Sequence, residues 1–374
     1  MEFTTEYSHL TSRQFAEQIM ESIQQEHGVD LRKIFENDAI SIREKSRIAR
    51  VRLTEALLAD LEHSGTLDAP ADADFNEEQA LNQLLDTEVD IEPNISLLTK
   101  DAAVVMEYRG DDVRQYMYTL TKRMENAGKA KTPGQLAIEL VAGGVISVGV
   151  PMAIGTIKAL RAGQAVLAAV RSGVTSIGLK TAIGAIVVVL VGFLLYLFLE
   201  NPKKVLGMVI NGTDKNLIVK DWQKGLDGQT GSDLFMAFGH MASYMKDNED
   251  GLASPEVQVR ARVDFGPNDP DNVVFSGIYF ADRNFGLRGA EGAMLFTSRD
   301  SDIRIGHLFA CPYFEDNGAY VAMAQPGQTA QQFYNDYYGK RQVSLDHSEG
   351  GYRLRSNVND ARGGVVACIA SITN

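Results

Sequence analysis

The chain has 374 residues, and its 36 Lys and Arg against 49 Asp and Glu give a formal net charge of −13. This acidic balance lacks the basic face that nucleic-acid binding requires, so we expect no nucleic-acid partner. The length predicts two or three domains that can each bury a core. The two cysteines, Cys311 and Cys368, are too few for a disulfide framework, and we expect both to be reduced core residues.

Residues 1–132 predict an acidic helical domain. Thr11 followed by Gln14 is a capping-box signal, and the apolar residues after it recur at helical spacing. Further helices are expected at about 41–63 and 75–85, and from a cap at Ser96 or Thr99 to about Asn126. Apolar stripes of this kind are typical of helices that pack in a bundle.

Two long uncharged runs follow, Leu140–Ile157 and Thr181–Leu199, and the connector between them carries four basic residues and no acid. An uncharged run of about 18 residues or more is a candidate membrane span. Residues 133–202 therefore predict a hydrophobic helical hairpin. The side chains expected to insert into a membrane are Val145, Val150, Ile154, Val188, Val191 and Leu195. The alternative is a hairpin buried in the core of a helical bundle.

After Pro202 the pattern changes to short, often alternating runs rich in Val, Ile, Phe and Tyr, separated by Asn-Gly and Gly-Gly pairs. This spacing is typical of a β-sandwich, here over residues 203–374, with one helical patch at Thr329–Tyr338. The expected fold class is thus α+β and multidomain. It combines an N-terminal helical bundle, a long hydrophobic helical hairpin and a C-terminal β-sandwich.

Several segments of residues 205–374 resemble actinoporins in order and spacing. Val209–Thr213 (VINGT) is similar to the opening strand shared by actinoporin-like lysins and fungal fruit-body lectins. Gly306–Tyr313 (GHLFACPY) resembles the membrane-contacting strand of actinoporins, and Phe333–Tyr338 (FYNDYY) resembles their short headgroup-facing helix. Residues 351–356 and 364–369 are similar to the last two strands of that family.

The resemblance implies an actinoporin-like sandwich with a membrane or headgroup site formed by Pro312, Tyr313, Phe333, Tyr337 and Tyr338. It implies a membrane lipid, with phosphocholine among the candidates, or a glycan as the partner. The chain departs from the family pattern in three places. Ala310 replaces a serine that helps hold phosphocholine, Phe333 replaces a tyrosine, and residues 314–318 are acidic where the family has a Trp-rich loop. These departures favour a headgroup or glycan site that is not specific for choline.

Motifs for catalysis are missing from the sequence. The six histidines have no metal-ligand partner at close spacing, and no nucleophile elbow, P-loop or Cys-x-x-Cys occurs. We therefore expect no enzyme activity, no cofactor and no metal.

The uncharged runs and the sandwich together predict a pore-forming, membrane-permeabilising toxin, a cytolysin that docks through its sandwich and inserts its hairpin. One hairpin cannot enclose an aqueous path, so we expect a homo-oligomer in the target-cell membrane. The first ten residues lack the basic and apolar regions of a signal peptide. We expect a protein made soluble in the cytoplasm, exported without a cleaved N-terminal signal, and active at the target-cell membrane.

Two alternatives remain from other classes. The first is a permanent two-span membrane protein with a C-terminal sandwich, whose basic connector 158–180 would be the cytoplasmic loop. The second is a lectin-like binding protein in which the hairpin is only core.

Overall fold

The computed structural model describes residues 7, 9–63, 94–130, 136, 145–148, 179–199, 203–219, 233–243, 257–264, 272–283, 287–298, 300 and 302–374. These residues belong to two compact units. The sandwich unit combines Asn94–Met117 with Asn201–Asn374, and the helical unit combines Glu2–Pro93 with Tyr118–Glu200. These bounds differ from the three consecutive domains that the sequence predicts, because Asn94–Met117 belongs with the sandwich.

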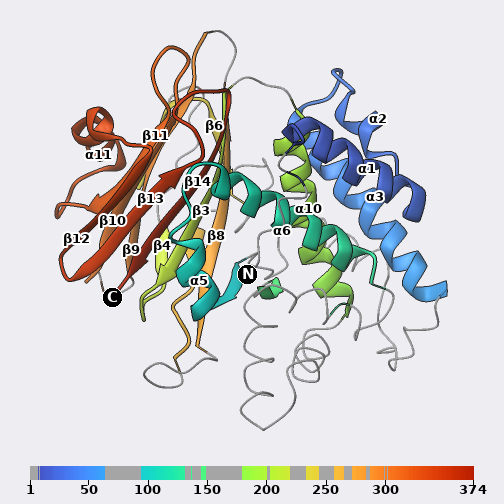
Figure 1. Ribbon diagram of the computed structural model, residues 1–374, viewed down its shortest axis with the longest axis horizontal. Helices are drawn as coiled ribbons and strands as arrows, with labels where there is room; N and C mark the ends of the chain where they lie inside the picture. Colours follow the sequence, from blue (N-terminus) through green and yellow to red (C-terminus); the bar gives the residue numbers. More distant parts are fainter. Residues whose placement is uncertain are drawn as a thin grey trace. The chain divides into compact units, whose positions relative to one another are not determined.

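Two sheets pack face to face in the sandwich unit, which confirms the predicted β-sandwich (Figure 1). Within this unit the strands of the first sheet follow the order β12-β13-β14-β3-β8-β1, and β6 also pairs with β8. Only β14 and β3 run parallel among these pairs. The strand bounds are β1 (Ile95–Leu98), β3 (Lys204–Gly212), β6 (His240–Ser243), β8 (Val273–Asp282), β12 (Ser344–Glu349), β13 (Tyr352–Val358) and β14 (Val365–Thr373).

The second sheet has the order β11-β10-β9-β4-β7, and β5 also pairs with β9. Its strands are β4 (Leu217–Val219), β5 (Leu234–Phe238), β7 (Val257–Val259), β9 (Ala290–Ser298), β10 (Arg304–Cys311) and β11 (Gly318–Met323). The unit also contains α5 (Thr99–Val105), α11 (Ala330–Tyr337) and the short helix η2 (Tyr338–Lys340). The boundary between the two units falls inside α6 (Asp111–Gly128).

A large tyrosine fills the space between the sheets. The Tyr279 hydroxyl lies 2.7 Å from Nε2 of His307, and both residues are buried. The Tyr279 ring lies over Gly207, where an added Cβ would be only 1.9 Å from its Cζ. Burial lowers the pKa of His307 from 6.5 to about 4, because the core disfavours the charged imidazolium. The sheets are therefore joined by close packing around a neutral histidine.

Asn211 organises the turn after β3. Its side-chain amide donates to the carbonyls of Lys215, Val259 and Arg260 at 2.7, 3.1 and 2.9 Å. Its Oδ1 accepts from both the backbone N–H and the hydroxyl of Thr213. The Asn-Gly-Thr segment at the start of the sandwich thus ties β3 in the first sheet to the end of β7 in the second.

The helical unit contains α1 (Ser12–His27), α2 (Leu31–Phe35), α3 (Ile42–His63), α10 (Leu179–Phe198) and the strand β2 (Val145–Val148). The capping box predicted at Thr11 and Gln14 is confirmed at the start of α1. The Phe15 ring of α1 stacks on Tyr118 of α6 with centroids 4.4 Å apart. The helix predicted at 41–63 is confirmed as α3, and the one predicted at 75–85 lies outside the described residues.

Two predicted helices are corrected by the structure. The helix predicted from Ser96 or Thr99 to about Asn126 is not continuous, because Ile95–Leu98 pairs with β8 as strand β1. The helix α5 begins at Thr99, the alternative start, and α6 follows as a separate helix. In the first uncharged run, Val145–Val148 forms a strand, which suits the β-branched residues of this segment. Its predicted inserting residue Val145 is thus in a strand, whereas Val150 and Ile154 lie outside the described residues.

The second uncharged run forms α10, which packs on α1 and α3. Its side chains from Ala182 to Phe198 are buried except Val188, which is half-buried. The predicted inserting residues Val191 and Leu195 are 0% and 2% exposed. This burial matches the alternative of a hairpin segment in a bundle core. None of the helices that the structure describes combines the length and apolar character needed to cross a membrane.

Candidate functional site

The short helix α11 is fixed on the outer face of the second sheet. A capping box between Thr329 and Gln332 starts it, and Phe333 and Tyr334 are buried against apolar residues of β9, β10 and β11. The Phe333 ring lies over Gly306 of β10. Phe333 is 0% exposed, so it positions the helix and does not belong to the exposed surface where the sequence placed it.

Tyr337 and Tyr338 lie at the end of the same helix and remain partly exposed. The Tyr337 ring stacks on Tyr320 of β11 with centroids 4.9 Å apart and planes at 16°. The Tyr338 ring lies 4.9 Å from the ring of Tyr334. The α11 backbone thus presents two tyrosines side by side at one border of the sheet.

A buried carboxylate holds the tyrosine hydroxyls. Glu291 is 3% exposed and accepts a hydrogen bond of 3.0 Å from the Tyr334 hydroxyl. The Tyr338 side chain is also hydrogen-bonded to Glu291. Burial, followed by the nearby negative charge, raises the pKa of both tyrosines, so each hydroxyl stays protonated and can donate.

The loop after β10 brings a second group of aromatic side chains to the surface. Pro312 is buried and Tyr313 is half-buried, whereas Phe314 is 79% exposed and lies against Tyr313 with ring centroids 5.0 Å apart. Pro312 therefore supports the loop and does not face a ligand. Sequence reasoning missed Phe314 because its neighbours are acidic, although a Phe directly after the Pro-Tyr pair is the signal that could have found it.

Arg341 joins the two groups of aromatic residues. Its guanidinium lies 3.9 Å above the Tyr338 ring, and its Nε donates to the carbonyl of Asp316 at 3.2 Å. It also pairs with the carboxylate of Glu315. The loop that carries Phe314 is thereby attached to the end of α11.

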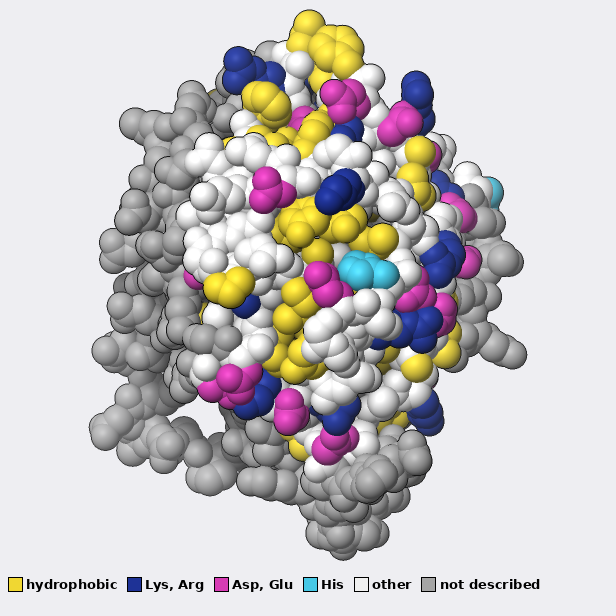
Figure 2. All heavy atoms as spheres, turned by 90° about the vertical axis from the view of Figure 1, so that its left-hand side faces the viewer, with side chains coloured by type: hydrophobic (Ala, Val, Ile, Leu, Met, Phe, Trp, Pro, Cys, Tyr) yellow, Lys and Arg dark blue, Asp and Glu magenta, His cyan; other side chains and the backbone are white. Residues whose placement is uncertain are grey.

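We call Tyr313, Phe314, Tyr320, Tyr337 and Tyr338 the aromatic surface. Figure 2 shows the side of the sandwich that carries α11 and β12, where hydrophobic side chains form a band bordered by basic and acidic ones. Of the five predicted site residues, the structure exposes Tyr313, Tyr337 and Tyr338 and buries the other two.

Two more apolar side chains are exposed at the end of the sheet where the Phe314 loop begins. Leu287, before β9, is 63% exposed and Phe238, at the end of β5, is 36% exposed. They lie at this end because Ala290 of β9 pairs with Cys311 of β10, and Phe238 pairs with Glu291. The position that the family fills with serine, Ala310, is instead fully buried beneath α11.

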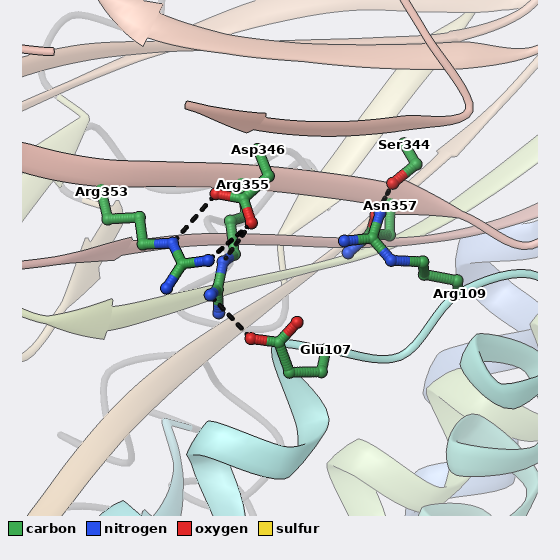
Figure 3. Close-up of polar contacts among 7 residues, drawn as sticks. All are labelled: Glu107, Arg109, Ser344, Asp346, Arg353, Arg355 and Asn357. Atoms are coloured by element: carbon green, nitrogen blue, oxygen red, sulfur yellow. Dashed lines mark hydrogen bonds and ion pairs between the residues drawn. The ribbon is translucent and has the colours of Figure 1, made fainter. Parts of the chain in front are cut away.

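A separate polar network lies on the first sheet, where the segment between α5 and α6 contacts β13, the neighbour of β12 (Figure 3). Arg353 donates to both oxygens of Asp346 at 3.0 and 2.8 Å. Arg355 bridges Asp346, at 3.2 Å, and Glu107, at 2.6 Å. These contacts, led by the hydrogen bond from Arg353, lower the pKa of Asp346.

The same network holds the connector at a second point. Arg109 donates to Oδ1 of Asn357 at 3.3 Å, and Ser344 donates to the same oxygen at 2.7 Å. The charged groups satisfy one another, so we interpret the network as structural. Within the described ranges, no group of three or more His, Cys, Asp or Glu is placed to hold a metal ion.

Comparison with known proteins yields no matching family model and no matching curated protein. Among solved structures, the lipid-binding protein Nakanori is 12% identical, with a TM-score of 0.30 over 46% of this chain and 72% of that chain. The wild-type lectin XCL of Xerocomus chrysenteron is also 12% identical, with a TM-score of 0.27 over 46% of this chain and 100% of the lectin.

A third similar structure is IP-1A from Alcaligenes faecalis, which is 8% identical, with a TM-score of 0.26 over 46% of this chain and 91% of that chain. At these identities and TM-scores the likenesses assign neither a family nor a ligand to the chain. What the chain itself shows is an α+β protein whose sandwich carries an exposed aromatic surface.

Proposed function

We propose that the protein binds lipid membranes through the aromatic surface. The observation that carries this proposal is Phe314, a large apolar side chain that is 79% exposed beside the half-buried Tyr313. Tyrosine combines an apolar ring with a polar tip and favours the membrane–water interface. Phe314 has no polar tip, so its exposure favours contact with acyl chains over stacking on a glycan.

The direct test is sedimentation of the full chain with liposomes. Replacing Phe314 with Ser should weaken binding about tenfold or more, because an aromatic ring no longer leaves water. Phe314→Trp should retain binding, and Val104→Ser is the matched control, since Val104 is a 42% exposed apolar residue on α5. Equal binding by wild type and Phe314→Ser would contradict the proposal.

A second variant tests the helix side of the surface. Tyr337 is half-buried, and its ring lies on the half-buried Tyr320 and 4.6 Å from the buried Phe333. Tyr337→Ala should therefore lose binding, while the protein still folds at a cost in stability of about 1 kcal/mol. A variant that unfolds, or that binds as well as wild type, would remove Tyr337 from the site.

Membrane permeabilisation is the second candidate function. Its support is the uncharged run Thr181–Leu199, and on this proposal α10 leaves the helical unit and several copies line a path in the target-cell membrane. The protein would then act there as a binding and permeabilising protein without enzyme activity. The structure itself presents α10 as a buried helix, so insertion requires a change of state.

Val188→Asp tests this candidate in a dye-leakage assay. Val188 is the half-buried position of α10, so the substitution disturbs the folded unit less than one at Val191. A charge at the bilayer centre costs about 2.5–3.5 kcal/mol on the insertion scale, so leakage should be abolished while liposome binding persists. If Val188→Asp protein causes as much leakage as wild type, α10 does not line the pore. If the variant does not fold, α10 is only a core helix.

A further inference from the structure

Basic side chains of the protein lie over the rings of three half-buried tyrosines of the aromatic surface. The ammonium of Lys203 lies 5.8 Å from the Tyr313 ring centroid, that of Lys340 lies 4.8 Å from the Tyr337 ring, and Arg341 lies 3.9 Å from the Tyr338 ring. A ring face attracts a cation through its quadrupole, and a second cation on the same face would be repelled by the first. A choline group would therefore have to displace a basic side chain of the protein.

The basic side chains at this end of the sandwich fall into two classes. Arg341 pairs with Glu315 and Arg362 pairs with Asp316, so these charges are neutralised within the protein. Lys203, Arg288 and Lys340 behave differently. Within the part of the chain that the structure describes, none of these three forms an ion pair with a carboxylate.

The three unneutralised cations are also held in place by aromatic rings. Lys203 and Lys340 lie over Tyr313 and Tyr337, and the Arg288 guanidinium lies 5.1 Å from the Phe238 ring centroid. Lys203 donates in addition to the carbonyl of Gly363 at 3.1 Å. The rings orient the cations, and the exposed apolar side chains Leu287 and Phe314 lie at the same end of the sheet.

We propose that the membrane bound by this surface is one rich in anionic phospholipid, and that Lys203, Arg288 and Lys340 contact its negatively charged headgroups. This inference rests on the proposed membrane-binding function and assigns its lipid class. In this arrangement Phe314 enters the interface while the three cations remain at headgroup level. The phosphate and carboxylate groups of the lipid are recognised, and a quaternary ammonium is not required.

The test compares liposomes of phosphatidylcholine alone with liposomes of phosphatidylcholine mixed with phosphatidylserine, using the full chain. Wild type should bind the mixed liposomes more tightly, and added salt should remove the difference because surface charges are then screened. A basic residue near an anionic surface contributes about 1 kcal/mol, which is about fivefold in affinity.

Single substitutions Lys203→Asn, Arg288→Gln and Lys340→Gln should therefore each reduce binding to mixed liposomes about fivefold, and the triple variant about a hundredfold. Asn is used at residue 203 because the backbone there has φ of 80°, which Asn tolerates. Arg362→Gln combined with Asp316→Asn is the matched control, since it removes an exposed ion pair without changing the net charge. It should bind mixed liposomes as wild type does.

The outcomes separate the two proposals. Failure to bind either kind of liposome would overturn membrane binding itself. If wild type binds both kinds of liposome equally, and the triple variant binds them as wild type does, the protein binds membranes but the anionic-lipid assignment is wrong. Competition by free phosphocholine, with no effect of phosphatidylserine, would likewise overturn it in favour of a choline site.

Discussion

The ring of Phe333 occupies the space directly above Gly306, where an added Cβ would lie 2.2 Å from Cε2 of the ring. The first residue belongs to α11 and the second to β10, so a glycine in a strand determines how closely the helix approaches the sheet. Tyr337 and Tyr338 owe their position on the surface to this contact, because they follow Phe333 on the same short helix.

Replacing Gly306 with Ala should destabilise the sandwich unit by about 1–3 kcal/mol, because the ring and the new methyl group cannot share the space. The shift of α11 should also weaken liposome binding. Urea denaturation and sedimentation measure the two effects. Gly339→Ala is the control, since a Cβ there meets nothing within 4 Å. A Gly306→Ala protein as stable as the control would mean that α11 is not held by this contact.

The stability of the protein should fall in acid partly through His307. Its pKa is lowered from 6.5 to about 4 in the folded chain, so between these values the unfolded chain binds a proton that the folded chain does not. Stability is therefore lost as the pH decreases from 6.5 to 4, with a slope of about 1.4 kcal/mol per pH unit for one proton.

The variant His307→Gln removes this group and should show a shallower decline over the same pH range. Urea denaturation at a series of pH values gives both slopes. The difference between them isolates His307, because the carboxylates are common to both proteins. Parallel curves for wild type and variant would exclude a neutral buried His307.

Asn211 should be among the polar residues most sensitive to substitution. Asn211→Ala removes five hydrogen bonds and leaves buried carbonyls without a donor, which should cost about 3 kcal/mol or more. Asn216→Ala is a control in the same turn, where one hydrogen bond to the Ala261 N–H is lost, and should cost about 1 kcal/mol. Equal losses in thermal denaturation would show that the turn does not depend on Asn211.

Two arginines that share one carboxylate allow a matched comparison on the first sheet. The side chain of Arg355 is 8% exposed and bridges Glu107 and Asp346, whereas that of Arg353 is 51% exposed and contacts Asp346 alone. Arg355→Ala should cost about 2–3 kcal/mol, because hydrogen bonds between charged groups are lost away from water. Arg353→Ala should cost about 1 kcal/mol or less. The reverse order in urea denaturation would refute this assignment.

Local signals in the sequence predicted local structure well. The capping box at Thr11, the helix that begins near Ser41 and the helical patch after Thr329 each depend on neighbouring residues, and the structure confirms them. The alternating runs after Pro202 likewise predicted most strands of the sandwich, but they missed β5, β6 and β12.

Long-range contacts could not be predicted in the same way. Ile95–Leu98 is a strand because β8 lies beside it, and no neighbouring residue signals that pairing. The spacing of Phe333, Tyr337 and Tyr338 indicates a helix but not which side faces the sheet. That choice depends on Gly306, in a distant strand. Exposure of Phe314 depends on how its loop leaves the sheet, which periodicity does not encode.

The pairing of β1 with β8 has a consequence for biosynthesis. Leu98 contacts Val273 in the finished sheet, so the ribosome completes the intervening chain, including α10, before β1 has its partner. At about 5–20 residues per second this interval is roughly 10 to 35 s. During it the edge of β1 that β8 will cover is open, and an open strand edge can pair with another chain. We therefore expect the nascent protein to engage a chaperone until β8 emerges.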